Sequence, residues 1–171
     1  GRYAEAEPMY RRALDIREGI AGPDHPSYAT LLINLAYNYD EDGQPERPGP
    51  VRRRALGIFR AKFGDDNPET AWAYTSLGSL LGQLGQHGEG ADMTIKALDI
   101  RRRLLGENHP LTAVAYNSVA AALVRRGGLE GAGDKAAEPY YRQALAILRQ
   151  SVGEAHIDTA RAHAATSNTP K

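Results

Sequence analysis

The sequence predicts an all-α protein, an α-solenoid of antiparallel helical hairpins, and three observations support this fold class. Glycines recur at a fixed spacing of 42 residues, at Gly22, Gly64 and Gly106. Each is followed by a short polar turn and, in "GPDHP" and "GENHP", by a histidine and a proline. The apolar residues between these turns follow the spacing of amphipathic helices. A repeat of this length indicates units that bury their apolar faces against one another.

Two helices fit in each repeat. In the first, apolar or aromatic residues fall three, four and seven positions apart and therefore lie on one face: Leu32, Leu35, Ala36 and Tyr39. The second helix has a corresponding stripe in the first and last copies of the repeat: Ala6, Tyr10, Ala13 and Leu14, then Ala137, Tyr141, Ala144 and Leu145. The repeating unit is therefore a helical hairpin.

The turn between repeats combines a stop signal with a start signal. Glycine suits the left-handed conformation that often ends a helix, because it has no Cβ. Proline is well placed in the first turn of the next helix, where its missing N–H costs nothing. The residue between them, His25, Asn67, His109 or His156, is therefore expected to cap the helix. The histidines are one repeat apart, too far to share a metal ion, and we expect no metal site.

The repeat period divides the chain into five units. Residues 1–24 hold the second helix of a truncated repeat, so we expect an excised piece of a longer protein. Full repeats follow over 25–66, 67–108 and 109–155, and residues 156–171 form a partial terminal repeat. The last copy of the turn is five residues out of phase, and the glycine-rich segment near 127–134 is predicted to be the inserted loop. The expected total is seven full helices and a partial eighth.

Two second helices depart from the repeat pattern. Pro48 and Pro50 occupy the start of one of them, and because proline disrupts a helix interior, this helix is expected to begin late, near Pro50. Gly88 and Gly90 occupy the start of the next, where glycine costs about 1 kcal/mol against alanine. We therefore expect a loose first turn there.

Composition excludes several classes of protein. Twenty-one basic residues balance 21 acidic ones, so nothing calls for a charged partner. Cysteine is absent, which excludes disulfides, thiolate zinc sites and cysteine nucleophiles. No apolar stretch approaches the ~18 residues needed to span a bilayer. We expect a cytoplasmic protein with no membrane partner.

No motif indicates catalysis or a cofactor. "GAGDKA" at 131–136 has the letters of a phosphate-binding loop, but it follows a predicted helix where that loop requires a strand. The arginine runs at 52–54 and 101–103 lie on second helices among acidic residues, which favours a solvated face with ion pairs over nucleic-acid binding. We therefore predict that the chain is not an enzyme and takes no cofactor.

Two stretches resemble a known family. "EAEPMYRRALDIR" at 5–17 and "GENHPLTAVAYNSVA" at 106–120 resemble the tetratricopeptide repeat in its 42-residue, kinesin-light-chain type. The resemblance implies a right-handed superhelix. It also implies that the first helix of each hairpin lines a concave groove, which holds peptides or partner proteins.

The residues of this groove are predicted by turning each first helix away from its core stripe. Asparagines at such positions can hold a peptide backbone through a donor and an acceptor, and only Asn34 and Asn117 supply that amide. Trp72 either faces the groove or is wedged between adjacent hairpins. The predicted set is Thr30, Ile33, Asn34, Tyr37 and Glu41 in one repeat, Trp72, Thr75, Ser76, Ser79 and Gln83 in the next, and Val114, Asn117, Ser118, Ala121 and Arg125 in the third.

These observations favour a non-catalytic interaction scaffold that binds a peptide or a partner segment in the groove. The alternative is a regulatory or oligomerising arm of a larger signalling ATPase or protease, which packs against its own parent protein. Self-association through exposed terminal helices belongs to that second interpretation.

Overall fold

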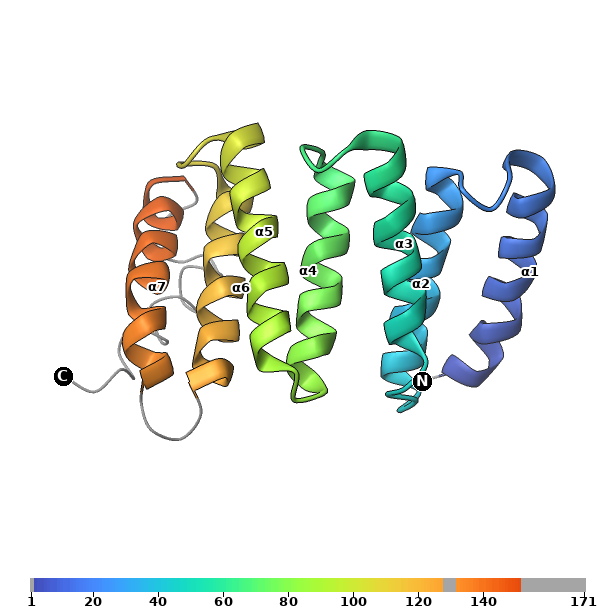
Figure 1. The fold of residues 1–171 in the computed structure, drawn as a ribbon, viewed down its shortest axis with the longest axis horizontal. Coiled ribbons are helices and arrows are strands. Elements are labelled where there is room, and N and C mark those ends of the chain that lie inside the picture. Colours follow the sequence, from blue (N-terminus) through green and yellow to red (C-terminus); the bar gives the residue numbers. More distant parts are fainter. Residues whose placement is uncertain (1, 128–131, 152–171) are drawn as a thin grey trace.

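The computed structural model describes residues 2–127 and 132–151, and every regular element among them is an α-helix. The described residues form seven helices, and Figure 1 shows how they follow one another along the array. In chain order they are α1 (Tyr3–Ala21), α2 (Pro26–Glu41), α3 (Pro48–Phe63), α4 (Pro68–Gln83), α5 (His87–Leu105), α6 (Pro110–Gly127) and α7 (Ala132–Ser151). The all-α solenoid predicted from the sequence is confirmed. The partial eighth helix and His156 fall outside the described residues.

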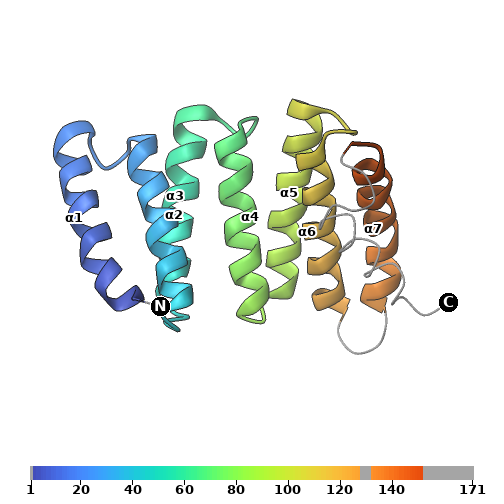
Figure 2. The same ribbon diagram turned by 180° about the vertical axis from the view of Figure 1, so that it is seen from behind.

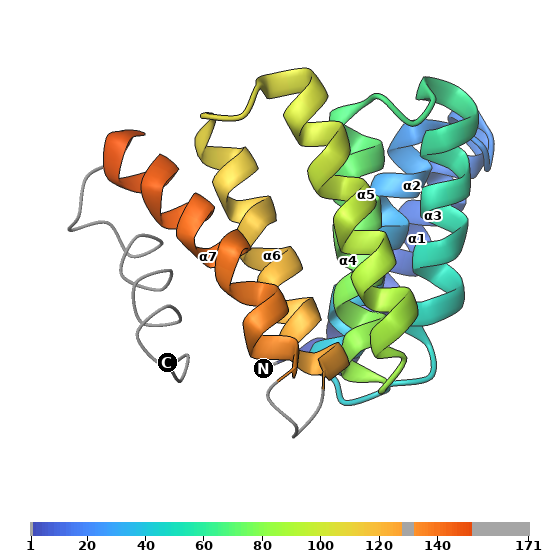
Figure 3. The ribbon, with the colours of Figure 1, turned by 60° about the vertical axis from the view of Figure 1, so that its left-hand side comes forward.

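The helices pair as antiparallel hairpins, α2 with α3, α4 with α5, and α6 with α7. We call α2, α4 and α6 the first helices, and α1, α3, α5 and α7 the second helices. Figures 1 and 2 show α1 and α7 at opposite ends of the row, and Figure 3 shows α6 between α5 and α7. Successive helices pack against each other, and α4 also contacts α6 in the next hairpin. Two first helices, α4 and α6, are therefore in direct contact across a hairpin boundary.

The apolar stripes of the hairpins form the core. Leu14, Leu35, Phe59 and Leu77 belong to one cluster of buried residues that extends from α1 to α5. A second cluster joins α5, α6 and α7. The predicted stripe of the first helix is buried as expected, at Leu32, Leu35, Ala36 and Tyr39. Each hairpin therefore contributes one layer to a core shared with its neighbours.

The turns between repeats have the predicted capping chemistry. Ser27 N–H donates to Nδ1 of His25 at 3.2 Å, and Leu111 N–H donates to Nδ1 of His109 at 3.1 Å. Asn67 accepts from Glu69 N–H at 2.9 Å through Oδ1. The preceding helices end at Gly22, Gly64 and Gly106, with φ values of 87°, 78° and 84°. That left-handed backbone explains the glycine, and the capping role predicted for these histidines is confirmed.

Both expectations about irregular helix starts need correction. α3 begins at Pro48, two residues before the expected start, because the first turn of a helix tolerates proline. α5 is helical from His87, so its predicted loose first turn is wrong. Gly90 is buried against Gly78 of α4, and a Cβ on either glycine would lie 2.8 Å from the carbonyl oxygen of the other. This glycine permits close helix packing.

The loop predicted near 127–134 is shorter than expected. α6 extends to Gly127 and α7 already begins at Ala132. A Cβ on Gly133 would lie 2.6 Å from the carbonyl oxygen of Leu123 and 2.8 Å from that of Val124. The residues from 132 onward therefore form the first turn of α7, and residues 128–131 of this segment lie outside the described structure.

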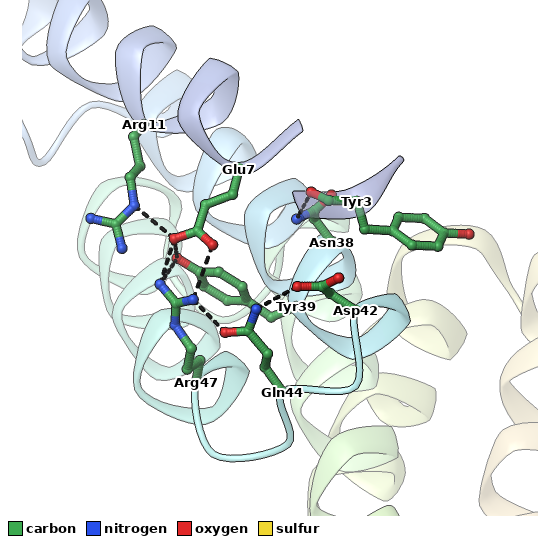
Figure 4. A network of polar contacts seen from close by, with 8 residues as sticks. All are labelled: Tyr3, Glu7, Arg11, Asn38, Tyr39, Asp42, Gln44 and Arg47. Atoms are coloured by element: carbon green, nitrogen blue, oxygen red, sulfur yellow. Dashed lines mark hydrogen bonds and ion pairs between the residues drawn. The ribbon is translucent and has the colours of Figure 1, made fainter. Parts of the chain in front are cut away.

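A polar network joins α1, α2 and the segment that leads into α3 (Figure 4). The guanidinium of Arg47 donates to both carboxylate oxygens of Glu7, at 2.6 and 3.0 Å, and stacks on the ring of Tyr39 at 3.9 Å. Arg11 donates to the same carboxylate at 2.9 Å. Hydrogen bonds from Arg47 and Arg11 hold the pKa of Glu7 below its ordinary value. We call Glu7, Arg11, Tyr39, Gln44 and Arg47 the α1 network.

Two features are absent from the described residues, a membrane-spanning helix and a cluster of metal ligands. None of the helices is long and apolar enough to cross a membrane. No group of three or more acidic or histidine side chains is arranged to hold a metal ion in that part of the chain.

Candidate binding surfaces

The predicted groove residues lie on the three first helices, and most keep some exposed surface. Thr30, Tyr37 and Glu41 are exposed on α2, and Asn34 is partly buried. On α4 and α6 the exposed or partly buried members are Trp72, Thr75, Ser79, Gln83, Val114, Asn117, Ser118, Ala121 and Arg125. We call these residues, with those of α2, the first-helix face. They repeat in the same register on three successive helices.

Two predicted positions have too little exposed surface to contact a partner in this conformation. Ile33 is 1% exposed and Ser76 is 3% exposed. The prediction from helical spacing assumed that only one side of each first helix is covered by its neighbours. Packing between hairpins, such as that of α4 against both α5 and α6, covers more of the helix surface than was assumed. The prediction of an open position is therefore wrong for Ile33 and Ser76.

Trp72 is wedged between adjacent hairpins. Its ring packs against Phe59 of α3, with the centroids 6.4 Å apart and the planes tilted by 52°. Phe63 also stacks on Phe59, with the ring centroids 6.3 Å apart. The second of the two interpretations of Trp72 is therefore the observed one, although the indole remains partly exposed.

The side-chain amide of Asn117 is not fully satisfied. Oδ1 of Asn117 is buried and has no hydrogen-bond partner within the described chain. An unpaired buried polar atom costs free energy, which the side chain can recover by turning outward toward a bound donor. Arg125, on the same helix, lies against the backbone of Gly82, where an added Cβ would be 3.1 Å from its Nε.

The arginine runs are used for ion pairs between and within hairpins. Arg53 of α3 donates to Glu89 of α5 at 2.8 Å, and Nε of Arg103 donates to Asp66 at 2.8 Å. Arg52 differs from the solvated arginine that the sequence predicts, because it is buried and paired with Asp40. Burial without a charged partner lowers the pKa of Arg101.

A second surface, on the second-helix side, was missed by sequence reasoning. At each of two turns between repeats, an arginine and a tyrosine donate hydrogen bonds to the same carboxylate. Asp65 accepts from Arg60 at 2.8 Å and from Tyr74 at 3.1 Å. Glu107 accepts from Nε of Arg102 at 2.7 Å and from the hydroxyl of Tyr116. The pattern R-x3-G-[DE], at 60–65 and 102–107 and again at 149–154, could have predicted these clusters.

Each cluster lines a pocket between consecutive second helices. The pocket between α3 and α5 has a volume of about 220 Å³ and contains Arg60, Asp65, Tyr74 and Lys96. The pocket between α5 and α7 has a volume of about 420 Å³. It contains Arg102, Glu107, Tyr116 and Gln143, which are the repeat equivalents of those four residues, together with Ile95, Leu98, Asp99, Pro139 and Tyr140. Burial raises the pKa of Tyr116 to about 12, so its hydroxyl stays protonated and donates to Glu107.

Comparison with known proteins identifies the family of these hairpins. Tetratricopeptide-repeat profiles match residues 1–47, 70–111 and 134–158, which together make up about two thirds of the chain. The chain belongs to the tetratricopeptide-repeat family. No curated protein sequence matches it significantly.

Solved structures agree with this assignment. Two crystal structures of a Podosopora anserina protein, described as a kinesin light chain with nearly identical TPR-like repeats, match with TM-scores of 0.84 and 0.83. Both are 18% identical and cover 99% of this chain, which spans 77% and 78% of theirs. BtubC (BKLC) from P. vanneervenii matches with a TM-score of 0.83 at 22% identity, over 99% of this chain and 65% of its own. These likenesses show that the fold is that of kinesin-light-chain-type repeats.

The family and the fold together identify a protein-interaction scaffold. Tetratricopeptide repeats generally bind protein or peptide partners, and repeat arrays of this fold are generally non-catalytic. The chain has two surfaces on which such a partner could lie, the first-helix face and the pockets between second helices.

Proposed function

We propose that the tetratricopeptide array binds a peptide or an extended partner segment along its first-helix face. The observation that carries this proposal is the repeated register of exposed side chains on α2, α4 and α6. Thr30, Trp72 and Val114 occupy one repeat position, and Tyr37, Ser79 and Ala121 occupy another two turns further along each helix. A strip with the same register on successive helices suits a segment that crosses all three.

The chemistry of the first-helix face favours a bound segment with apolar side chains. Tyr37 is exposed under the guanidinium of Arg52, whose central carbon lies 4.9 Å from the ring centroid. Val114 adds apolar surface, as does the part of the Trp72 indole that stays exposed beside Phe59, and aromatic residues of this kind are enriched at interfaces. Asn34 and Asn117 supply amides for the backbone of the bound segment.

The proposal is tested with a peptide selected from a random library on the intact chain. Titration of this peptide is followed by the emission of Trp72, which is the only tryptophan. Asn34→Ala and Asn117→Ala are each expected to weaken binding by about five- to thirtyfold, the effect of losing one hydrogen bond at a partly desolvated site.

Asn108→Ala is the matched control, because Asn108 is exposed in the turn before α6 and lies outside the first-helix face. It is expected to leave the dissociation constant unchanged. Unchanged affinity in both of the other asparagine variants, with no change in Trp72 emission, would place the contact surface elsewhere and refute the proposal.

A second candidate function, an oligomerising or regulatory arm that packs against its own parent protein, is favoured by one observation. Ile16 of α1 is 53% exposed, whereas its repeat equivalents Ile58, Ile100 and Ile147 are at most 6% exposed. Met9 and Ile20 are exposed on the same helix. Sedimentation equilibrium of wild type and Ile16→Glu tests this candidate. Self-association that Ile16→Glu abolishes would support it, and a monomer in both cases would count against an oligomerising role.

A further inference from the structure

One position on the second helices carries a cation in two hairpins and a neutral residue in the third. Arg54 of α3, Lys96 of α5 and Gln143 of α7 are repeat equivalents. The guanidinium carbon of Arg54 lies 5.5 Å from the ring centroid of Tyr28, and Nζ of Lys96 lies 5.8 Å from that of Tyr74. Each of these two hairpins therefore places a cation of its own over a tyrosine ring.

The pocket between α5 and α7 keeps Tyr116, the repeat equivalent of Tyr74, but lacks the cation; Tyr28 occupies a different repeat position. Gln143 lines it beside Tyr116 and Tyr140, whose ring centroids are 6.0 Å apart with the planes tilted by 49°. Its volume of about 420 Å³ compares with about 220 Å³ for the pocket that Lys96 lines. The larger pocket thus has room where the equivalent pocket holds a lysine.

The charges that line this pocket favour a cation. Two carboxylates, Asp99 and Glu107, face one guanidinium, that of Arg102. Arg102 is engaged by Glu107 at 2.7 Å and pairs more loosely with Asp99, at 4.0 Å. Asp99 also borders the smaller pocket that Lys96 lines. Two carboxylates against one guanidinium leave a net negative charge on the lining of the larger pocket, which a second cation would balance.

The walls favour a cation with an aliphatic stem. Ile95, Leu98 and Pro139 provide apolar surface beside the two tyrosine rings. Lysine and arginine side chains bury such stems along apolar surface and keep the charged group at a polar edge. The ring of a tyrosine attracts the charged group itself.

We propose that the pocket between α5 and α7 is a docking site for a lysine or arginine side chain of a partner polypeptide. The bound cation occupies the place that Lys96 fills in the preceding hairpin, over Tyr116 and next to Asp99. An anionic group would instead meet the two carboxylates. The site lies on the second-helix side and does not depend on peptide binding at the first-helix face.

The experiment uses Nα-acetyl-lysine amide, whose side-chain ammonium group is free, as the probe. Nα-acetyl-norleucine amide is its neutral counterpart. Amide chemical shifts of the intact chain are followed by nuclear magnetic resonance during titration with each compound. The lysine probe is expected to shift the amides of 95–102 and 139–143 saturably, with an affinity about tenfold higher than that of the norleucine probe. Equal affinities of the two probes would overturn the proposal.

Two substitutions exchange the properties of the equivalent pockets. Gln143→Lys supplies the missing cation and is expected to weaken lysine binding about tenfold or more. Lys96→Gln removes the equivalent cation from the smaller pocket, where Arg60 and Arg103 still balance Asp65 and Asp99, and that pocket is expected to bind the lysine probe more weakly than the larger one does. Gln150→Lys adds the same charge at an exposed position of α7 and is expected to leave binding within about twofold, since exposed charges are screened. Undiminished binding in Gln143→Lys, or an equal loss in Gln150→Lys, would refute the docking site.

Discussion

Two junctions between helices, that of α1 with α2 and α3 and that of α4 with α5, are held together by different chemistry. α1 is fixed to α2 and to the start of α3 by the α1 network, in which Arg47 clamps Glu7 and stacks on Tyr39. α4 and α5 instead meet backbone to backbone, at Gly78 and Gly90. The same repeat geometry is therefore maintained in one place by charged side chains and in the other by the absence of side chains.

The difference shows which changes each junction tolerates. A polar network tolerates small shifts, because long side chains can reorient and part of their energy is screened by water. A contact between two glycines has no such freedom, since any added atom meets a carbonyl oxygen. Substitutions at the α4–α5 contact should therefore have larger effects than substitutions in the α1 network.

The largest effect is expected for Gly78→Val. Its Cβ would lie 2.8 Å from the carbonyl oxygen of Gly90 and 2.9 Å from Cγ2 of Thr94. We expect the free energy of unfolding to fall by about 3 kcal/mol, the upper part of the range for overpacking. Urea unfolding followed by far-ultraviolet circular dichroism measures it.

Gly88→Ala is the matched control for that substitution. Gly88 lies in the first turns of α5 with no atom near its added Cβ. Alanine is therefore expected to raise the free energy of unfolding by about 0.5–1 kcal/mol. Equal effects of the two substitutions would show that the α4–α5 contact is not tight.

A smaller loss is expected when the buried arginine of α3 loses its partner. Arg52 is 2% exposed, and Nη1 lies 3.3 Å from Oδ1 of Asp40 in addition to the closer contact through Nη2. Asp40→Asn removes the charge that compensates this guanidinium. Because Asp40 itself is partly exposed, we expect a loss of about 2 kcal/mol, below the usual range for a fully buried pair.

The double substitution Asp40→Asn with Arg52→Met tests whether that loss comes from the uncompensated charge. Replacing both partners removes the buried guanidinium and should recover most of the stability. A double variant as unstable as Asp40→Asn alone would indicate that packing around Asp40 is responsible.

Gly133→Ala tests the junction between α6 and α7. The added Cβ would lie 2.6 Å from the carbonyl oxygen of Leu123 and 3.0 Å from Cα of Gly127. We expect a loss of about 1–2 kcal/mol, less than at Gly78, because the end of α6 can shift more easily than a helix interior. An increase in stability, as expected for alanine in an unobstructed helix, would contradict the packing of α7 on α6.

Most of the fold could be predicted because its determinants are local. The spacing of Leu32, Leu35 and Tyr39 defines a helix face, and the Gly64 to Pro68 turn contains both a stop and a start signal. The start of α5 could not be predicted in the same way. The role of Gly90 depends on Gly78, which lies in another helix, and a single sequence does not show which helices approach closely.

The candidate sites were less predictable, for a similar reason. Periodicity placed Ile33 and Ser76 on an open face, but it contains no information about how far the neighbouring hairpins extend over that face. The pocket between α5 and α7 draws its lining from three helices and from the turn before α6. Arg102, Glu107 and Tyr116 keep the spacing of Arg60, Asp65 and Tyr74, but this spacing does not show that a pocket lies between α5 and α7.

The smallest effect is expected for Glu7→Gln, and it should depend on pH. Hydrogen bonds from Arg47, and then from Arg11, lower the pKa of Glu7 in the folded chain below the ordinary value of 4.5. A carboxylate with a depressed pKa stabilises the fold above its unfolded pKa, and this contribution is lost as the pH falls through the folded value. Glu7→Gln should therefore be less stable than wild type at neutral pH, and the difference should shrink progressively below pH 4.5.

Glu46→Gln controls for the change in net charge, since Glu46 is an exposed carboxylate for which no ion pair is found in the described part of the chain. Urea unfolding of the three proteins across this pH range gives the comparison. A gap between wild type and Glu7→Gln that stays constant from neutral to acidic pH would mean that shape rather than charge holds α1 in place. The α1 network would then resemble the glycine contact between α4 and α5, because both would depend on fit.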